Sequence, residues 1–167
     1  MVKNEWIVVC DAGPIIHLDE LNCLDILDFQ KILVPITVWE EILQYRRIPL
    51  EKIKGLEIIE RTDFTTEFLE ICKLYDLHKG EAAAIFLSLE LKNSILFTDD
   101  GAARLYAKSK NIAVHGTIGI LLRAVRKNIR SPENIIEILK NIKTNSTLHI
   151  SGTLIEEAIL AIRQIRA

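Results

Sequence analysis

Short apolar runs recur along the chain and alternate with longer segments of helical periodicity. The runs are Trp6–Cys10, Lys31–Val34, Leu56–Ile59, Ser94–Thr98 and Ile112–Val114. Continuous apolar runs of this length are typical of strands that are buried on both faces, as in a parallel sheet. The pattern therefore predicts five strands.

Segments of helical periodicity separate and follow these strands. Helices are predicted from Pro14 through Leu18, over Leu21–Phe29, after Pro35, over Phe64–Tyr75, over Gly80–Leu91, between Thr98 and Ala107, and over Ile118–Val125, Pro132–Ile142 and Leu154–Ile165. Strands separated by helices imply right-handed crossovers and a parallel sheet with helices on both faces. The predicted fold class is therefore α/β.

Length and composition indicate one folded domain. The 167 residues are 49% hydrophobic and 26% charged, and this length lies in the usual range of ~100–200 residues for a single domain. We expect one domain over residues 1–167, in which residues 131–167 form a C-terminal helical extension packed on the rest. The polar stretch Asn141–Ser151 marks the joint, because the 16 residues after it are too few for a second domain.

Charge and cysteine content exclude several classes of protein. The 21 basic residues nearly balance the 23 acidic ones, so any nucleic-acid surface must be local. No apolar run reaches the ~18–20 residues of a membrane helix, and the N-terminus lacks a secretory signal pattern. Cys10, Cys23 and Cys72 form no CxxC pair, which disfavours a zinc ribbon or a disulfide framework. We expect a cytoplasmic protein with no membrane contact and with buried, reduced thiols.

Acidic residues follow two of the predicted strands. Asp11 comes directly after the first strand, and Asp99 and Asp100 come directly after the fourth. The carboxyl ends of parallel strands lie at one edge of a sheet, where binding sites form. Each aspartate could instead cap the following helix by accepting backbone N–H bonds, and for Asp100 the two interpretations are balanced.

Glutamates on two helices adjoin the same edge. At ~100° per residue, Glu41 lies on the apolar face of its helix with Val38, Ile42 and Tyr45, and Glu40 points to solvent. Glu41 could also be an ordinary residue at the boundary of that face.

Glu81 opens another helix, where alanines after it permit close packing. The helix dipole alone would also favour an anionic side chain at this position.

Carboxylates that converge in this way would repel one another without a cation. Mg²⁺ and Mn²⁺ prefer oxygen ligands, and such an ion can generate a nucleophilic hydroxide and stabilise charge on a phosphodiester. An aspartyl-phosphate mechanism needs a second aspartate at position 13, where this chain has Gly13. Glycoside hydrolysis needs two carboxylates and accounts less well for the aspartates at strand ends. The four histidines, His17, His78, His115 and His149, share no short metal-ligand spacing and are expected to be structural or surface residues.

Four segments resemble the PIN-domain family, the metal-dependent ribonuclease fold found in the toxin half of many prokaryotic toxin–antitoxin pairs. They are Val8–Pro14, Val34–Glu41, Gly80–Ile85 and Phe97–Arg104. The segment His115–Gly119 is similar to a PIN-like subgroup of prokaryotic proteins. The resemblance spans roughly residues 5–130. It implies a three-layer α/β/α sandwich around a parallel sheet of about five strands.

The resemblance also implies an acidic cluster that binds Mg²⁺ or Mn²⁺ and directs water at an RNA phosphodiester. Asp11, Glu41, Glu81 and Asp99 match the four acidic positions in order, and Asp100 is a substitute for the last. The third position is more often Asp in toxin members, so the longer Glu81 is a departure that bears on catalytic competence.

Roles for these residues follow as expectations. Asp11 and Asp99 would ligate the metal directly. Glu41 would bind it or orient the attacking water, and Glu81 would bind it directly or through water. Other polar residues are expected to contact the substrate or the acidic cluster. Thr98 would hydrogen-bond a carboxylate or phosphate, and Arg104 would pair with the cluster or touch phosphate. The RNA backbone would be met by Arg46, Arg47 and Lys79. For exposed basic residues, plain solubility is the default alternative.

Three functions remain open at this level. The first is a metal-dependent endoribonuclease. The second is a non-catalytic module that binds RNA or protein, which the slightly acidic net charge favours a little. The third is a toxin with an antitoxin partner, whose helix would occupy a groove lined by Leu18, Leu21, Leu24 and Leu27, although their spacing is also that of an ordinary buried helix face. Homodimers are common in the resembled family.

Overall fold

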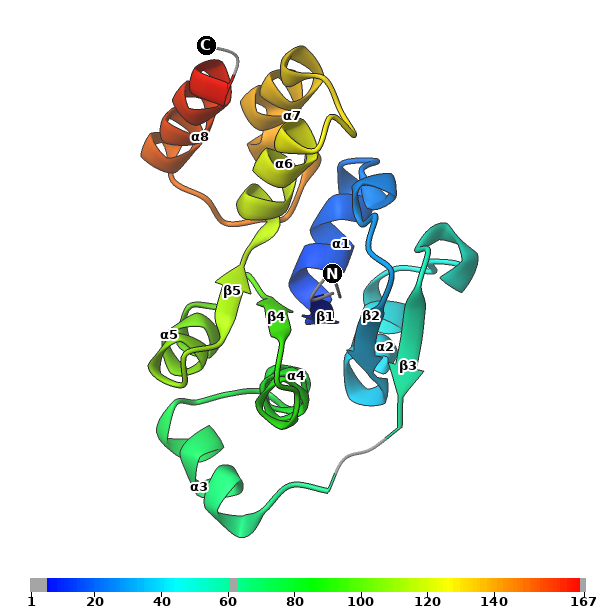
Figure 1. The fold of residues 1–167 in the computed structure, drawn as a ribbon, viewed down its shortest axis with the longest axis vertical. Coiled ribbons are helices and arrows are strands. Elements are labelled where there is room, and N and C mark those ends of the chain that lie inside the picture. Colours follow the sequence, from blue (N-terminus) through cyan, green and yellow to red (C-terminus); the bar gives the residue numbers. More distant parts are fainter. Residues whose placement is uncertain (1–5, 61–62, 166–167) are drawn as a thin grey trace, which may run out of the picture.

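A five-stranded parallel sheet forms the centre of the computed structural model, which describes residues 6–60 and 63–165 (Figure 1). The strands are β1 (Ile7–Cys10), β2 (Ile32–Pro35), β3 (Leu56–Ile59), β4 (Ser94–Phe97) and β5 (Ala113–His115), in the order β3-β2-β1-β4-β5. Every neighbouring pair is parallel. The α/β class and all five predicted strands are confirmed, each to within one residue at either end.

Helices connect the strands and follow the last one. They are α1 (Ala12–Glu20), α2 (Ile36–Tyr45), α3 (Thr66–Leu74), α4 (Lys79–Glu90), α5 (Gly101–Ser109), α6 (Thr117–Arg126), α7 (Pro132–Asn145) and α8 (Gly152–Ile165), with short 3-10 turns at Leu24–Ile26 and Leu50–Lys52. The helix predicted over Leu21–Phe29 is wrong, since only one 3-10 turn forms there. Asn22 has a positive φ of 53°, which ends α1 and prevents a regular helix from continuing.

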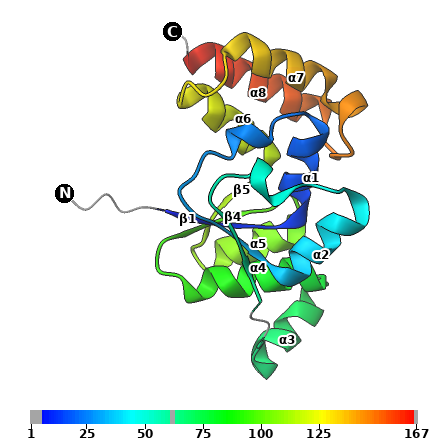
Figure 2. The same ribbon diagram turned by 90° about the vertical axis from the view of Figure 1, so that its right-hand side faces the viewer.

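Alternation along the strands divides the core between two helical layers. Val8 and Cys10 of β1 pack in a cluster with α1, α2, α6, α7 and α8, whereas Val9 packs on the opposite face with α3, α4 and α5. Successive side chains of a strand point to opposite faces, so one apolar run supplies both layers. Figure 2 shows the sheet edge-on, with α6, α7 and α8 on one side and α3, α4 and α5 on the other. The predicted three-layer arrangement is confirmed.

The last two helices share the core of the first layer. Ile135, Leu139 and Ile142 of α7, and Ala158 and Ile162 of α8, are buried in the same cluster as α1 and α6. Burying a large aliphatic side chain contributes about 1.5–3 kcal/mol, so these contacts hold the helical pair firmly against α6. The chain between α7 and α8 is thereby fixed as well.

The burial of four leucines and of Tyr45 can be compared with the predictions. Leu18, Leu21, Leu24 and Leu27 are all buried, so the core interpretation is confirmed and these side chains do not line an open groove. Tyr45 is 71% exposed, because α2 ends at this residue, beyond its contact with the sheet. The prediction that Tyr45 lies on the buried face is wrong.

The three cysteines, Cys10, Cys23 and Cys72, are buried and free, as predicted. Within residues 6–60 and 63–165, no helix combines the length and apolar character needed to cross a bilayer.

Candidate functional site

The strand order places a crevice at the carboxyl ends of β1 and β4. From β1 the chain runs through α1 to β2 on one side, and from β4 it runs through α5 to β5 on the other. Loops that leave two neighbouring strands in opposite directions open a crevice between them. Asp11 follows β1 and Asp99 follows β4, so both carboxylates lie at this crevice.

Strand register brings Asp11 beside Thr98. Cys10 pairs with Phe97, and the Asp11 N–H donates to the Phe97 carbonyl at 2.9 Å. The next residues then meet: the Thr98 hydroxyl donates to Asp11 Oδ2 at 2.8 Å, and the Ala12 N–H donates to Asp11 Oδ1 at 2.8 Å. Asp11 thus caps α1, which was the alternative interpretation, and its carboxylate also faces the crevice.

Burial changes the protonation of Asp11. The side chain is only 5% exposed. Burial raises its pKa from 3.8 to about 7; the bonds from Thr98 and Ala12 oppose this, and the charges of Glu81 and Glu41 add to it. These two glutamates therefore lie close enough to act on Asp11 electrostatically.

Asp99 is held by three hydrogen bonds from two elements. His17 Nδ1 of α1 lies 2.8 Å from Asp99 Oδ2. At the start of α6, the Thr117 N–H donates to Oδ1 at 2.7 Å and the Thr117 hydroxyl donates to Oδ2 at 2.6 Å. Burial alone would raise the pKa of Asp99, but the bonds from His17 and Thr117 outweigh it and hold that pKa below its ordinary value. Asp99 is consequently an ionised, fixed carboxylate.

Two glycines make room for the carboxylates. A Cβ atom on Gly116 would lie 2.6 Å from Asp99 Oδ1, and one on Gly80 would lie 2.8 Å from Glu41 Oε2. Real Cβ atoms do not approach other atoms so closely. Glycine at these two positions therefore permits the backbone to pass directly beside Asp99 and Glu41.

Packing of α2 on α4 adds the two glutamates. Glu41 is partly buried, and burial and the charge of Glu81 raise its pKa, while His78 lowers it. Glu40 is exposed, so the predicted division between the two neighbours is confirmed. Glu81 lies in the first turn of α4, where Oε2 accepts the His78 N–H at 2.8 Å. This bond orients Glu81 from its own helix end.

All five predicted acidic residues line one cavity of about 270 Å³. Its lining consists of Asp11, Ala12, Gly13, His17, Glu41, Glu81, Asp99, Asp100, Thr147, Leu148 and His149. Asp100 also caps α5, since its Oδ1 accepts the Ala103 N–H at 2.7 Å. Asp100 therefore both caps a helix and lines the cavity. Carboxylates from four separated segments thus face one space.

The donor chemistry of this acidic cavity fits a hard divalent cation. The carboxylates supply oxygen ligands, and burial raises the pKa of both Asp11 and Glu41, with their mutual repulsion adding to it. Among the described residues, no three His, Cys, Asp or Glu side chains are grouped as a ready-made metal site.

Hydrogen bonding leaves the carboxylates unequally available. A carboxylate has roughly four acceptor positions. Asp99 uses three of them and Asp11 uses two, whereas Glu41 accepts no hydrogen bond from any residue described here. Glu81 and Asp100 each accept one backbone N–H, so Glu41 is the most open carboxylate and Asp11 and Asp99 are the most occupied.

Three residues that were expected to contact substrate have different partners in the structure. Thr98 is fully buried and its hydroxyl serves Asp11, so it is a partner of the carboxylate. Arg104 Nη1 donates to the Thr98 carbonyl at 3.5 Å and forms no ion pair with any described carboxylate, so the expected pairing with the acidic cluster is not made. Arg46 pairs with Asp19.

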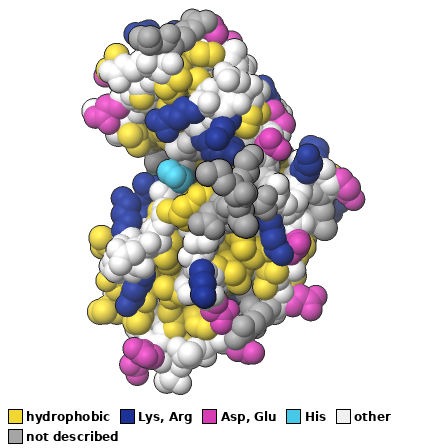
Figure 3. Space-filling model, in the orientation of Figure 1, with side chains coloured by type: hydrophobic (Ala, Val, Ile, Leu, Met, Phe, Trp, Pro, Cys, Tyr) yellow, Lys and Arg dark blue, Asp and Glu magenta, His cyan; other side chains and the backbone are white. Residues whose placement is uncertain are grey.

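Lys79 is exposed in the first turn of α4, and neither Arg46 nor Lys79 lines the acidic cavity. On the face seen in Figure 3, basic side chains are spread out and do not form one patch.

Sequence reasoning missed three contributors to the site. His17 was assigned to structure or surface, yet it contacts Asp99. One feature could have indicated this contact: His17 is a polar residue one turn after Gly13, on a helix whose inner face is otherwise apolar. For Thr117 the available signal was its place in His115–Gly119, the segment that resembles a PIN-like subgroup. The connector between α7 and α8, which supplies Thr147–His149 to the cavity, gave no comparable signal because it approaches from a distant part of the chain.

Comparison with known proteins agrees with this geometry. A family model described as a PIN domain matches residues 7–164, which is nearly the whole chain. A search of curated proteins finds no match to the chain.

Proposed function

The chain belongs to the PIN-domain family, and from this premise we propose that it is a metal-dependent ribonuclease that hydrolyses RNA phosphodiester bonds. PIN domains are generally nucleases that use divalent metal ions. The observation that carries the proposal is the convergence of Asp11, Glu41, Glu81 and Asp99 on one cavity. The proposed cofactor is Mg²⁺ or Mn²⁺, because the donors are carboxylate oxygens.

Each carboxylate has a role that its surroundings support. Glu41 would hold the ion, since it accepts no hydrogen bond from a described residue, and Asp11 and Asp99 would contribute their remaining acceptor positions, in Asp99 the free one on Oδ1. When bound, the ion would supply a nucleophilic hydroxide and positive charge against the phosphodiester. Asp11, with a pKa of about 7, would give up its proton as the ion enters. Glu81, which His78 orients, would bind directly or through water.

His17 and Thr117 act through Asp99. Their hydrogen bonds fix the carboxylate and keep it ionised at neutral pH. A carboxylate held in this way needs no reorganisation when a cation arrives, which is how outer partners strengthen a metal site.

Cleavage of RNA by matched variants tests the proposal. Single-stranded and structured RNA would be incubated with the wild type, Asp11→Asn, Asp99→Asn and Glu40→Gln, in Mn²⁺ and in EDTA. We expect cleavage by the wild type and by Glu40→Gln in Mn²⁺ alone, with a loss of about 100-fold or more in the two aspartate variants. Equal cleavage by all four proteins would reveal a contaminating nuclease and overturn the proposal.

A non-catalytic binding module is the second candidate. Two observations favour it: the described carboxylates form no ready-made metal site, and Asp99 is largely occupied by His17 and Thr117. Calorimetric titration with Mn²⁺ separates the candidates. No binding at millimolar Mn²⁺, together with RNA binding, would support the module.

A role as the toxin of a toxin–antitoxin pair is a narrower form of the first candidate. The leucines considered for an antitoxin groove are buried, so that groove no longer supports it. An adjacent small gene for a DNA-binding protein, and co-purification of the two products, would test the partnership. The same purified sample would report whether the chain forms a homodimer.

A further inference from the structure

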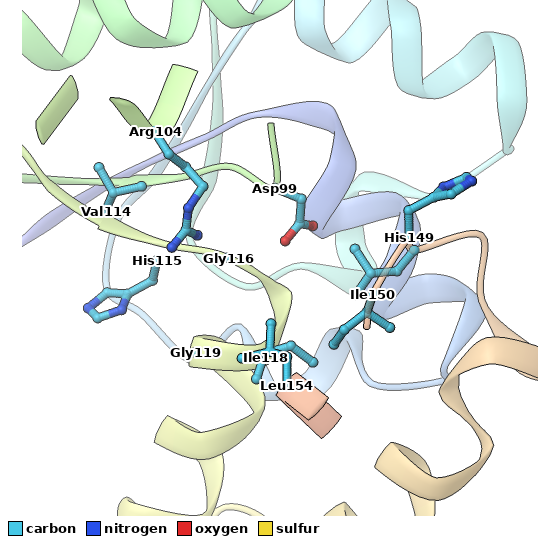
Figure 4. Close-up of a pocket in the computed structure, with 11 residues that line it drawn as sticks. Asp99, Arg104, Val114, His115, Gly116, Ile118, Gly119, His149, Ile150 and Leu154 are labelled. Atoms are coloured by element: carbon cyan, nitrogen blue, oxygen red, sulfur yellow. The ribbon is translucent and has the colours of Figure 1, made fainter. Parts of the chain in front are cut away.

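A second cavity of about 390 Å³ adjoins the acidic one. Its lining shares Asp99, Leu148 and His149 with the acidic cavity and adds residues of α5, β5, α6 and α8. Figure 4 shows Asp99 between Arg104 on one side and Ile150 on the other. The two cavities are therefore neighbours whose common wall includes Asp99.

Arg104 supplies an uncommitted positive charge to this second cavity. Its guanidinium has five N–H donors, yet among the described residues its one hydrogen bond is the long contact of 3.5 Å to the Thr98 carbonyl, and it pairs with no described carboxylate. A Cβ atom on Gly116 would lie 2.9 Å from Nη1, so glycine lets the guanidinium pass beside the backbone. A planar guanidinium with free donors is suited to binding phosphate oxygens.

The wall facing Arg104 is aliphatic. Ile118 of α6, Ile150 of the connector and Leu154 of α8 line it, and Figure 4 shows these side chains directed toward the space below Asp99. An apolar wall combined with a few polar groups is typical of small-ligand sites, which measure roughly 300–1,000 Å³. The size and chemistry suit one nucleotide, with its sugar and base on the wall and a phosphate at Arg104.

The connector that completes this wall is anchored. Glu20 at the end of α1 accepts hydrogen bonds from the Ser146 hydroxyl at 2.8 Å and from the Thr147 N–H at 2.7 Å. The Ser146 hydroxyl in turn accepts the Leu148 N–H at 3.1 Å. The C-terminal helical pair therefore presents Leu148–Ile150 to the cavity in one fixed position.

We propose, on the basis of the ribonuclease function above, that this second cavity is a subsite for the RNA nucleotide next to the scissile phosphate. Arg104 binds the adjoining phosphate, and Ile118, Ile150 and Leu154 hold the sugar and base. The shared wall at Asp99 places a nucleotide here immediately beside the acidic cavity. The α7–α8 connector and α8 thus take part in substrate binding.

Binding of a fluorescein-labelled oligouridylate decamer, followed by anisotropy in EDTA, tests the subsite without turnover. Arg104→Met removes the charge and keeps the aliphatic stem, and Lys127→Met removes one exposed charge that does not line the cavity. Leu154→Asp places a negative charge in the wall, and Leu160→Asp makes the same change at an exposed position of the same helix. Melting curves check that each variant is folded.

We expect Arg104→Met and Leu154→Asp each to weaken binding about fivefold or more, and the two control variants to change it less than about twofold. The dependence of the dissociation constant on salt should fall by roughly one phosphate contact in Arg104→Met. Equal effects of each variant and its control, or no RNA binding by the wild type, would overturn the subsite.

The subsite and the ribonuclease function fail in different ways. A protein that cleaves RNA in Mn²⁺ but is indifferent to both cavity substitutions loses the subsite alone. A protein that binds RNA as expected in EDTA but shows no cleavage in any metal loses the ribonuclease function alone.

Discussion

His17 Nδ1 lies 2.8 Å from Asp99 Oδ2, so the helix after the first strand and the loop after the fourth are joined at the centre of the site. We predict that His17→Phe, which keeps the size of the side chain, raises the pKa of Asp99 toward its ordinary value, because one of the bonds that lowers it is lost. Carboxyl carbon NMR titration measures this shift.

The same substitution should lower stability by about 1 kcal/mol at neutral pH. A carboxyl whose folded pKa is lowered stabilises the protein above its unfolded pKa, and that contribution is lost as pH falls through the folded value. The difference between wild type and variant should therefore shrink below pH ~3.8, the ordinary pKa of Asp. His149→Phe is the control, and an equal shift of the Asp99 pKa in that variant would contradict the prediction.

Asp11→Asn should alter the dependence of stability on pH. The folded pKa of Asp11 is raised from 3.8 to about 7. A raised pKa means that stability is fully present below the unfolded value and is lost as pH rises from 3.8 to about 7. In EDTA, the wild type should lose stability across this window and the variant should not, so that the variant is more stable at pH 8 by up to roughly 4 kcal/mol.

Thermal melting of both proteins from pH 4 to pH 8 measures this difference. The amide oxygen can still accept the Ala12 N–H, so the start of α1 is retained. A variant that is less stable than the wild type at pH 8 would show that Asp11 is not destabilised by burial.

Gly80→Ala should weaken Mn²⁺ binding while the fold survives. The new Cβ would lie 2.8 Å from Glu41 Oε2, so the flexible glutamate must move away from its present position. Disturbing the surroundings that position a ligand typically costs about 10-fold or more in metal affinity, which calorimetry measures directly. Gly101→Ala is a matched control, because nothing lies within 4 Å of its added Cβ; an equal loss of affinity there would refute this account of Gly80.

Glu20→Gln should loosen the connector between α7 and α8. Bonds from Ser146 and Thr147 to the charged carboxylate would weaken, since an ionised acceptor forms the stronger bond. We expect faster hydrogen exchange at the Thr147 amide and a loss of about 1 kcal/mol in stability. Glu156→Gln on the exposed surface of α8 should leave both quantities unchanged, and an unaltered Thr147 exchange rate in Glu20→Gln would argue against the anchor.

Much of the fold could be predicted because its signals are local. Each apolar run lies within one residue of a strand of the sheet, since burial on both faces demands a continuous apolar stretch. The failure at Leu21–Phe29 has an equally local cause, the positive φ of Asn22. That conformation is common for asparagine but not fixed by it, so the sequence alone could not exclude a helix there.

The position of the acidic residues was predictable for a topological reason. Parallel strands must end at the same edge, so Asp11 and Asp99 were expected to meet once the strands were recognised. Glu41 followed from helical geometry, and Glu40 is exposed as expected. Thr98 was also expected to bond a carboxylate or a phosphate, and it bonds Asp11. The partners of Asp99, which are His17 and Thr117, were not predictable in the same way.

The parallel sheet, the layers of helices and the edge at which the carboxylates gather follow from the order of the residues, because hydrophobic period and strand ends are properties of neighbouring residues. The groups that hold Asp99 and the connector that closes the cavity are visible in the folded protein alone. His17 and Asp99 are separated by 82 positions, and Glu20 and Thr147 by 127. Contacts over such separations depend on how the helices pack against the sheet, which no local pattern encodes.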